Sequence, residues 1–131
     1  VDDSVFTSVV LPFCENKHFS NFYAKGLGLV SHGCCILYKL ETFLLIDKSI
    51  VTFDADHMTN RARKSVALIA VLKVKKHAEK EKLIICCTTH LTFGQRDENI
   101  RIKQIFYIIE RLRNVSTLYN DPLIIFSGDF N

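Results

Sequence analysis

The sequence lacks any hydrophobic run long enough to cross a membrane. No apolar stretch reaches the ~18 residues that a spanning helix needs, and no secretory leader opens the chain. An excess of one charge is also missing, because 17 Lys and Arg stand against 14 Asp and Glu and leave a net charge of +3. This balance excludes a strongly basic, histone-like binder but is compatible with an anionic ligand. We therefore expect a soluble protein with no membrane partner.

The cysteines lack the C-x-x-C spacing of common metal and redox sites. There are five, an odd number; one is Cys14, and the other four form the adjacent pairs Cys34–Cys35 and Cys86–Cys87 inside apolar runs. Neighbouring cysteines form a disulfide only with strain, and in a strand they face opposite ways, which disfavours a zinc site with His32 or His90. We expect reduced, buried thiols with no disulfide partner, typical of an intracellular protein, cytoplasmic or nuclear.

Internal repeats and low-complexity tracts are also missing from the sequence. A chain of 131 residues makes at most one domain. Its 48% hydrophobic and 24% charged residues are an ordinary globular composition, which excludes a disordered chain. The only methionine is Met58, and the sequence ends on Gly-Asp-Phe-Asn directly after an apolar run. We interpret the 131 residues as part of a longer chain.

Short apolar runs separated by polar stretches predict several strands. They are expected at 35–39, 43–46, 50–53, 66–74, 83–89 and 123–126. The runs at 66–74 and 83–89 are apolar almost throughout, so both faces of these strands should be buried, and the charged stretch 75–82 between them predicts a hairpin turn. The first 31 residues show little periodicity and predict loops with one or two short elements, and 54–64 predicts a polar loop.

One segment, 97–114, has the periodicity of a helix. Its apolar residues recur at steps of three and four and predict a stripe for packing; they are Ile102, Ile105, Phe106, Ile109 and Leu112. Asp97 is the expected N-cap, because its carboxylate would accept hydrogen bonds from the first free amides of the helix. With a buried strand at 123–126 after the helix, the order of elements indicates an α/β fold with helices packed on sheets.

Polar side chains follow two of the predicted buried strands. His90 comes directly after 83–89, and Asp129 and Asn131 follow 123–126. Folds of the α/β class place functional groups at the carboxyl ends of central strands, and in an extended backbone Asp129 and Asn131 would leave on the same side. An imidazole, a carboxylate and a carboxamide together suit water attack on a phosphate ester. A turn aspartate and a structural histidine are the alternative interpretation.

Three motifs resemble those of the endonuclease/exonuclease/phosphatase superfamily. The first is Thr89-His90-Leu91, the second is the helix pair Arg101 and Gln104, and the third is an apolar strand ending in Gly128-Asp129-Phe130-Asn131. Upstream, GCCILYK at 33–39 is similar to the deadenylase-like branch that includes angel, nocturnin and the carbon-catabolite-repression deadenylases. The resemblance implies a layered sandwich of two mostly antiparallel or mixed sheets with helices outside. Residues 1–131 would form a central part of that domain, without its N-terminal and C-terminal motifs.

The resemblance also implies roles for single residues. Asp129 would orient or deprotonate the attacking water, Asn131 would hold that site and a phosphate oxygen, and His90 would donate to the scissile phosphate. Arg101 and Gln104 would tie the helix to a loop or lie near the site. Relatives hydrolyse phosphodiesters with Mg²⁺. Here Asp129 is the one assignable ligand, and a single carboxylate is a poor magnesium site.

Other residues are candidates for contact with an RNA substrate. Arg61, Arg63 and Lys64 form a basic stretch before a central strand and are candidates for phosphate contact. Phe93, in the loop after the 83–89 strand, is the aromatic residue expected to stack on a base. A poly(A)-like RNA or another RNA 3′ end is the partner that the resemblance implies.

Departures from the family's pattern limit the predicted function. The early asparagine and glutamate and the terminal aspartate–histidine pair of relatives have no match. Close relatives often carry Asp where this chain has His32 and Asn where it has Ser65, so their substrate contacts do not carry over to these positions. The sequence predicts a segment of a magnesium-dependent phosphodiesterase, an RNA 3′-end exonuclease of the deadenylase type, inactive by itself. The alternatives are a non-catalytic remnant or binding protein of this fold, and a phosphatase acting on RNA ends or small phosphorylated molecules.

Overall fold

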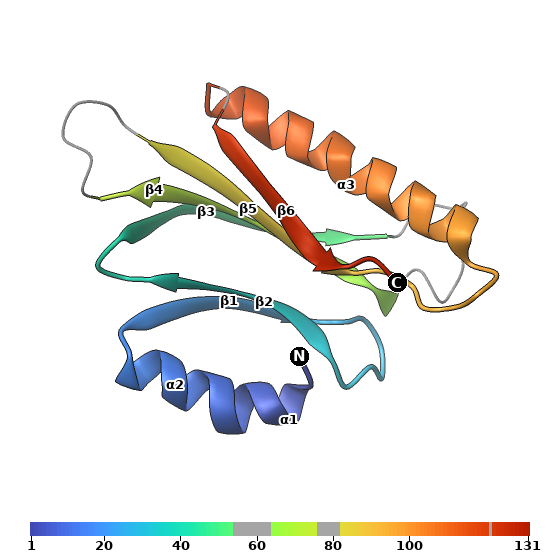
Figure 1. Ribbon diagram of the computed structural model, residues 1–131, viewed down its shortest axis with the longest axis horizontal. Helices are drawn as coiled ribbons and strands as arrows, with labels where there is room; N and C mark the ends of the chain where they lie inside the picture. Colours follow the sequence, from blue (N-terminus) through green and yellow to red (C-terminus); the bar gives the residue numbers. More distant parts are fainter. Residues whose placement is uncertain (54–63, 76–81, 121) are drawn as a thin grey trace.

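The computed structural model describes residues 1–53, 64–75, 82–120 and 122–131. Its elements in chain order are α1 (Asp3–Val5), the π-helical segment η1 (Phe6–Val10), α2 (Leu11–Asn16), β1 (Phe19–Lys25), β2 (Gly33–Lys39), β3 (Phe43–Thr52), β4 (Val66–Val74), β5 (Leu83–His90), α3 (Glu98–Leu118) and β6 (Leu123–Asp129). In Figure 1 the N-terminal helices lie below the sheet of β1 and β2, and α3 lies above the sheet of β3, β4, β5 and β6. The chain is thus an α/β structure with two sheets and helices outside them.

The strands form one antiparallel sheet and one mixed sheet. β1 pairs with β2 antiparallel. The second sheet has the order β3-β4-β5-β6, in which the first two pairings are antiparallel and the last is parallel. The predicted antiparallel pairing of β4 with β5 is confirmed, while most of the turn between them lies outside the described residues. Helix α3 supplies the crossover that the parallel pair β5 and β6 requires.

Strand β4 is buried on both faces and forms the centre of the core. On one face Val66, Leu68, Ala70 and Leu72 pack against the β1–β2 sheet. On the other face Ala67, Ile69 and Val71 pack in a cluster with Ile108 and Leu112 of α3. Two apolar faces explain why this run does not alternate in the sequence. Removing both faces from water is a large favourable term in folding.

The N-terminal region is more regular than the sequence-based expectation of loops. Residues 3–16 are helical through α1, η1 and α2, and β1 follows. Only Phe6 and Cys14 of these helical segments are buried. So few buried positions give the sequence almost no helical periodicity, which is why the prediction was wrong. Pro12, the second residue of α2, follows the π-helical segment η1 and provides no N–H to this continuous helical run.

Strand β3 is one strand where two, 43–46 and 50–53, were expected. Its register with β4 shifts between Leu45 and Asp47. A shift of this kind is a local irregularity of the β-bulge type, which bends a strand without ending it. The polar stretch 47–49 was therefore wrongly interpreted as a break between strands.

Helix α3 is longer than predicted and buries a different face. Asp97 is the N-cap residue, but its side chain makes no capping hydrogen bond; its carbonyl accepts from the Arg101 N–H at 2.9 Å. The buried line consists of Gln104, Ile108, Leu112 and Ser116. Of the predicted stripe, Ile102, Phe106 and Ile109 are exposed, and Phe106 is 68% exposed. The prediction of the buried face was wrong because it considered apolar residues alone, whereas the polar Gln104 and Ser116 face the sheet. No helix in the described parts of the chain is long and apolar enough to span a membrane.

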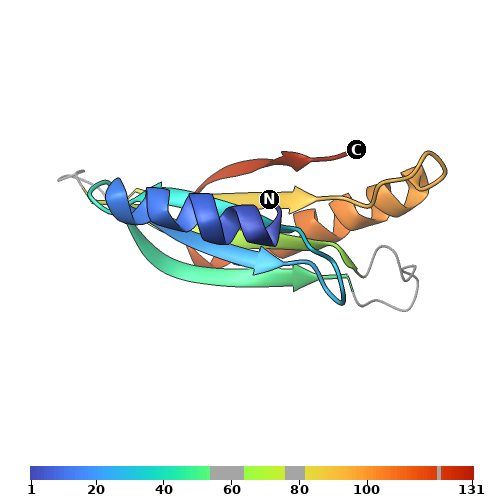
Figure 2. The same cartoon turned by 90° about the horizontal axis from the view of Figure 1, so that it is seen from below.

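Strand β6 lies at the edge of the mixed sheet and is exposed, contrary to the prediction of a buried strand. In Figure 2 it runs along the upper edge, beside β5. Leu123 is 63% exposed and Ile125 is 47% exposed. Within the described residues β6 has a strand neighbour on one side only. An apolar run therefore does not by itself reveal whether a strand is covered.

Candidate active site at the carboxyl ends of two parallel strands

The parallel strands β5 and β6 end side by side and bring predicted site residues to one edge of the sheet. His90 and Asp129 are partners in the register. Beyond them, the Leu91 N–H donates to the Asp129 carbonyl at 2.9 Å. Figure 1 shows the end of β6 beside the segment that leaves β5. The β-ladder itself therefore sets the distance between the two side chains.

The side chains of His90 and Asp129 form an open pair. Nε2 of His90 lies 3.7 Å from Oδ2 of Asp129, and the two side chains are 40% and 64% exposed. Oδ1 of Asp129 accepts the Asn131 N–H at 3.0 Å. A carboxylate in this position can accept a proton from water, and an imidazole N–H can donate to an anionic oxygen. Solvent exposure leaves room for a substrate beside the pair.

Asn131 ties the end of β6 to the loop after His90. Its Nδ2 donates to the Leu91 carbonyl at 2.8 Å. The sequence-based expectation assumed an extended backbone at this position. That assumption is wrong, since Asn131 has φ 56°, in the left-handed region. Asparagine tolerates this conformation better than most residues. The carboxamide thus braces the site in addition to any contact with a ligand.

The loop after His90 is held by two residues of α3. Oε1 of Gln104 accepts the Thr92 N–H at 3.1 Å, and Gln104 is fully buried. Nη1 of Arg101 donates to the Gly94 carbonyl at 2.7 Å and to the Thr92 carbonyl at 3.4 Å. Arg101 and Gln104 therefore connect α3 to the loop through hydrogen bonds. This is one of the two roles that the resemblance implied for them.

Substitution of Gln104 by Leu is expected to lower the free energy of unfolding by about 2 kcal/mol. The Thr92 N–H would stay buried without its acceptor, and such a group costs about 1–3 kcal/mol. Urea denaturation followed by circular dichroism measures the change. Lys103→Ala, at the exposed neighbour on α3, is the control and should change stability by less than about 0.5 kcal/mol. Equal effects of the two substitutions would contradict the role of Gln104.

A cavity of about 410 Å³ opens beside His90. Its lining residues are Val30, His32, Lys64, Ser65, His90, Leu91, Thr92, Phe93 and Gly94. Two residues predicted for substrate contact, Lys64 and Phe93, thus share one cavity, and Phe93 is 77% exposed. Arg61 and Arg63, and almost all of the predicted 54–64 loop, lie outside the described residues.

The imidazole of His32 lies against that of His90. The ring centroids are 5.3 Å apart, with 46° between the ring planes. His32 directly precedes β2, and its carbonyl accepts the Gly26 N–H at 3.0 Å. Sequence reasoning considered His32 as a disfavoured zinc ligand and as a departure from relatives, and did not predict it as a substrate contact. No signal in the sequence could have paired it with His90, because the contact joins two sheets.

Three of the cysteines, Cys14, Cys34 and Cys87, are buried, and Cys35 and Cys86 are half-buried. Burial raises the pKa of the Cys87 thiol to about 12, and the nearby Cys34 and Cys86 contribute further. Burial also raises the pKa of Cys35 to about 11. All five cysteines are free. Protonated thiols are weak nucleophiles and weak metal ligands, so the chemistry of the site rests on oxygen and imidazole groups.

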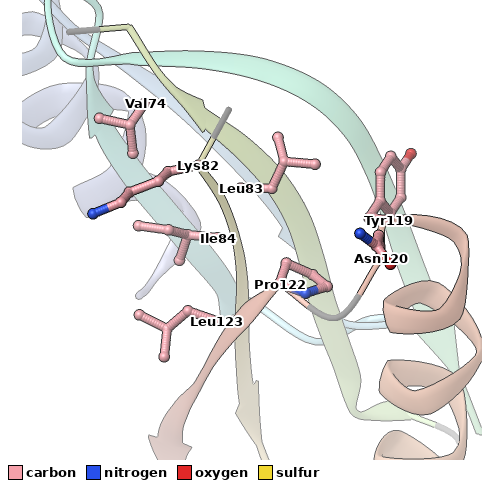
Figure 3. Close-up of a pocket in the computed structure, with 8 residues that line it drawn as sticks. All are labelled: Val74, Lys82, Leu83, Ile84, Tyr119, Asn120, Pro122 and Leu123. Atoms are coloured by element: carbon pink, nitrogen blue, oxygen red, sulfur yellow. The ribbon is translucent and has the colours of Figure 1, made fainter. Parts of the chain in front are cut away.

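A second cavity, of about 550 Å³, lies at the opposite ends of the same strands. Figure 3 shows the residues that line it, which are Val74, Lys82, Leu83, Ile84, Tyr119, Asn120, Pro122 and Leu123. This cavity lies at the amino ends of β5 and β6, with Val74 at the end of β4 and with Tyr119 and Asn120 after α3. Folds of the α/β class bind ligands at the carboxyl ends of parallel strands. At its edge the Tyr119 hydroxyl donates to Oδ2 of Asp47 at 3.1 Å. Because His90 and Asp129 lie at the carboxyl ends of the parallel strands, we place the candidate site there.

Curated relatives can be aligned with most of this chain, although no protein-family model matches it. Protein angel of Drosophila melanogaster is 34% identical over 117 residues, which cover 89% of this chain and 32% of angel. The "Probable CCR4-Not complex 3'-5'-exoribonuclease subunit Ccr4" of Vairimorpha ceranae is 25% identical over 136 residues, which cover 96% of this chain and 27% of that protein. The chain thus spans about a third or less of the length of these relatives.

Solved structures share the fold over nearly all of the chain. The structure of ANGEL2, described as a 2',3'-cyclic phosphatase in complex with adenosine-2',3'-vanadate, matches with a TM-score of 0.86 and 23% identity and covers 100% of this chain and 38% of that one. The human nocturnin catalytic domain matches with a TM-score of 0.83 and 17% identity and covers 99% of this chain and 49% of that one. The chain belongs to the endonuclease/exonuclease/phosphatase superfamily. Within it, the chain falls in the branch of angel, nocturnin and Ccr4.

Members of this superfamily are typically metal-dependent. Mg²⁺ takes oxygen ligands, usually one or two carboxylates with water and substrate phosphate. Across the described residues, no group of three or more His, Cys, Asp or Glu side chains is placed to hold a metal ion. Asp129 offers one carboxylate, beside an imidazole. The described residues therefore do not make a complete magnesium site.

Proposed function

We propose that these residues form part of the active site of a hydrolase that cleaves phosphate esters at RNA 3′ ends. The observation that carries the proposal is the register of β5 and β6, which sets His90 beside Asp129 at an open edge of the sheet. The Ccr4 relative is described as a 3'-5'-exoribonuclease and ANGEL2 as a 2',3'-cyclic phosphatase. Both descriptions place a phosphate at a ribose 3′ oxygen, which supports an RNA end as the substrate.

The three site residues have different roles in the proposed reaction. Asp129 accepts a proton from the attacking water through its exposed carboxylate. His90 donates a hydrogen bond to a phosphate oxygen, where negative charge develops during the attack. Asn131 holds the end of β6 against the loop and keeps the other two side chains aligned.

The surrounding residues supply contacts to RNA in this proposal. Lys64 binds a backbone phosphate, together with the neighbouring Arg61 and Arg63, and Phe93 stacks on a base. The positive charge of Lys64 and the exposed ring of Phe93 beside one cavity support these contacts.

Residues 1–131 are, in this proposal, part of one catalytic domain that uses Mg²⁺. A bound Mg²⁺ would supply positive charge for the phosphate oxygens, and Asp129 would be one of the residues that hold it. A second carboxylate comes from elsewhere in the domain, because the described residues do not provide it. The 131 residues alone are therefore expected to be inactive.

A phosphatase that acts on the 2′,3′-cyclic phosphate of an RNA end is the second candidate. The match to ANGEL2 over the whole chain, with a TM-score of 0.86, favours it. The same pair of side chains serves either reaction, since both begin with water attack on phosphorus. A binding protein without catalysis is the third alternative.

A chimera tests these alternatives. The 131 residues replace the matching stretch of ANGEL2, and the folded chimera is assayed on oligoadenylate and on RNA ending in a 2′,3′-cyclic phosphate. We expect hydrolysis of at least one substrate, and its loss when a chelator removes Mg²⁺. Unmodified ANGEL2 is the positive control on the cyclic phosphate. A cooperatively folded chimera that is inactive on both substrates would support the non-catalytic alternative.

A further inference from the structure

We propose that His32 is a substrate-binding residue which, with Lys64 and His90, forms a site for the phosphate group of a nucleotide. The first observation is the contact between the two imidazoles, whose centroids are 5.3 Å apart. Each of these two neighbouring imidazoles can donate a ring N–H to an anion. The identity of the nucleotide, a terminal unit of RNA, rests on the proposed function, whereas the phosphate site rests on the geometry alone.

The backbone around His32 is held in place by hydrogen bonds. The Gly26 N–H donates to the His32 carbonyl at 3.0 Å, and the Leu27 N–H donates to the Lys64 carbonyl at 3.0 Å. The second hydrogen bond attaches the loop between β1 and β2 to Lys64, which lies two residues before β4. This attachment brings His32 and Lys64 to the same side of the cavity.

The described residues that line the cavity offer hydrogen-bond donors and no acid, while Oδ2 of the Asp129 carboxylate lies 3.7 Å from Nε2 of His90. Two adjoining hollows share His32, Lys64, Ser65 and His90 in their linings. No Asp or Glu is found among the described residues that line either hollow. An ammonium group, two imidazoles and a hydroxyl suit the oxygens of a phosphate, because hydrogen bonds to a charged acceptor are the stronger kind.

Thr92 gives a second, independent observation at the same cavity. Its Oγ1 is buried and has no hydrogen-bond partner among the described residues. Buried polar atoms nearly always have a partner, and Thr92 is part of the cavity lining. A phosphate oxygen is a partner of the right chemistry for this hydroxyl. Next to it, the exposed ring of Phe93 favours a nucleotide over a free phosphate ion.

Nuclear magnetic resonance titration of the 131-residue chain with adenosine 5′-monophosphate tests the inference. We expect saturable shifts of the His32 and His90 ring signals, and a weaker response to inorganic phosphate, which lacks the base. His32→Asn should weaken the affinity by about tenfold, as expected for one hydrogen bond to a charged group. Lys64→Gln should weaken it by a similar factor and serves as a second variant at an exposed position.

His18→Asn is the matched control. His18 and His32 lie at opposite ends of the β1–β2 ladder. His18 directly precedes β1, and His32 directly precedes β2. Asparagine tolerates the positive φ of His18, 55°. We expect its affinity to stay within about twofold of the unchanged chain.

Two results would overturn the inference. One is an absence of shifts at His32 and His90, and the other is an unchanged affinity in both His32→Asn and Lys64→Gln. The assay of the chimera is separate from this titration. Hydrolysis without any effect of His32 would reject His32 and keep the proposed function. Nucleotide binding that depends on His32, in a chimera without hydrolysis, would keep the phosphate site and reject the hydrolase.

Discussion

Substitution of Asp129 by Ala in the ANGEL2 chimera is expected to lower the turnover number by about 100-fold or more. The substitution removes the proton acceptor for water, and a positioned acid or base contributes about 10²–10⁴-fold to a rate. Asp129→Asn separates two effects, because its amide oxygen can still accept the Asn131 N–H but cannot take a proton. A similar loss in both variants would assign the effect to the charged carboxylate, which takes the proton and would bind Mg²⁺, and not to the hydrogen bond with Asn131. The measurement is hydrolysis at saturating substrate and Mg²⁺.

Asp47→Asn is the control for this series. Asp47 is exposed on β3, and its Oδ2 accepts the Tyr119 hydroxyl at 3.1 Å, near the cavity at the far ends of the strands. Its turnover should stay within about twofold of the unchanged chimera. Turnover that survives in Asp129→Ala would remove Asp129 from the mechanism and favour a role in turn formation.

Substitution of Gly128 by Ala is expected to destabilise the chain by about 3 kcal/mol or more. Gly128 has φ 148°, a conformation that L side chains rarely adopt. A Cβ at this position would lie 2.2 Å from the Thr89 carbonyl oxygen and 2.9 Å from its nitrogen. Both contacts are with the backbone of β5, which cannot rotate away, so strain and overpacking add together. Urea denaturation measures the loss.

Gly28→Ala provides the comparison within the same chain. Gly28 has φ 74°, and a Cβ there would meet no atom within 4 Å. Only the conformational cost of about 1–2 kcal/mol remains. Equal losses at the two glycines would show that the approach of β6 to β5 does not limit stability. Where Gly128→Ala still folds, we expect it to lose activity as well, because the same approach sets His90 beside Asp129.

Much of the strand structure could be predicted from the sequence. The runs at 66–74 and 83–89 became β4 and β5 because nearly every residue in them is apolar, and few other structures bury such runs. The positions of His90 and Asp129 followed from the same logic, since each comes at the end of an apolar strand. Helix α3 was predicted from its periodicity, although its buried face was wrongly chosen because Gln104 and Ser116 face the sheet.

Other features could not be predicted because they are contacts between distant segments. The 3.7 Å distance between His90 and Asp129 depends on the parallel register of two strands that a helix separates. The neighbourhood of His32 and His90 depends on how the loop between β1 and β2 meets the end of β5. Neither arrangement leaves a periodic signal along the chain.

By itself, the amino-acid sequence determined which segments become strands, where polar groups follow them and which superfamily the motifs resemble. Local hydrophobic patterning and motif spacing are properties of neighbouring residues, so they can be recognised without coordinates. Only the tertiary structure decided which strands pair, that β6 is an exposed edge, and that His32, Lys64 and Thr92 share a cavity with His90. Pairing and packing join residues far apart in the chain, and their geometry is set by the whole fold.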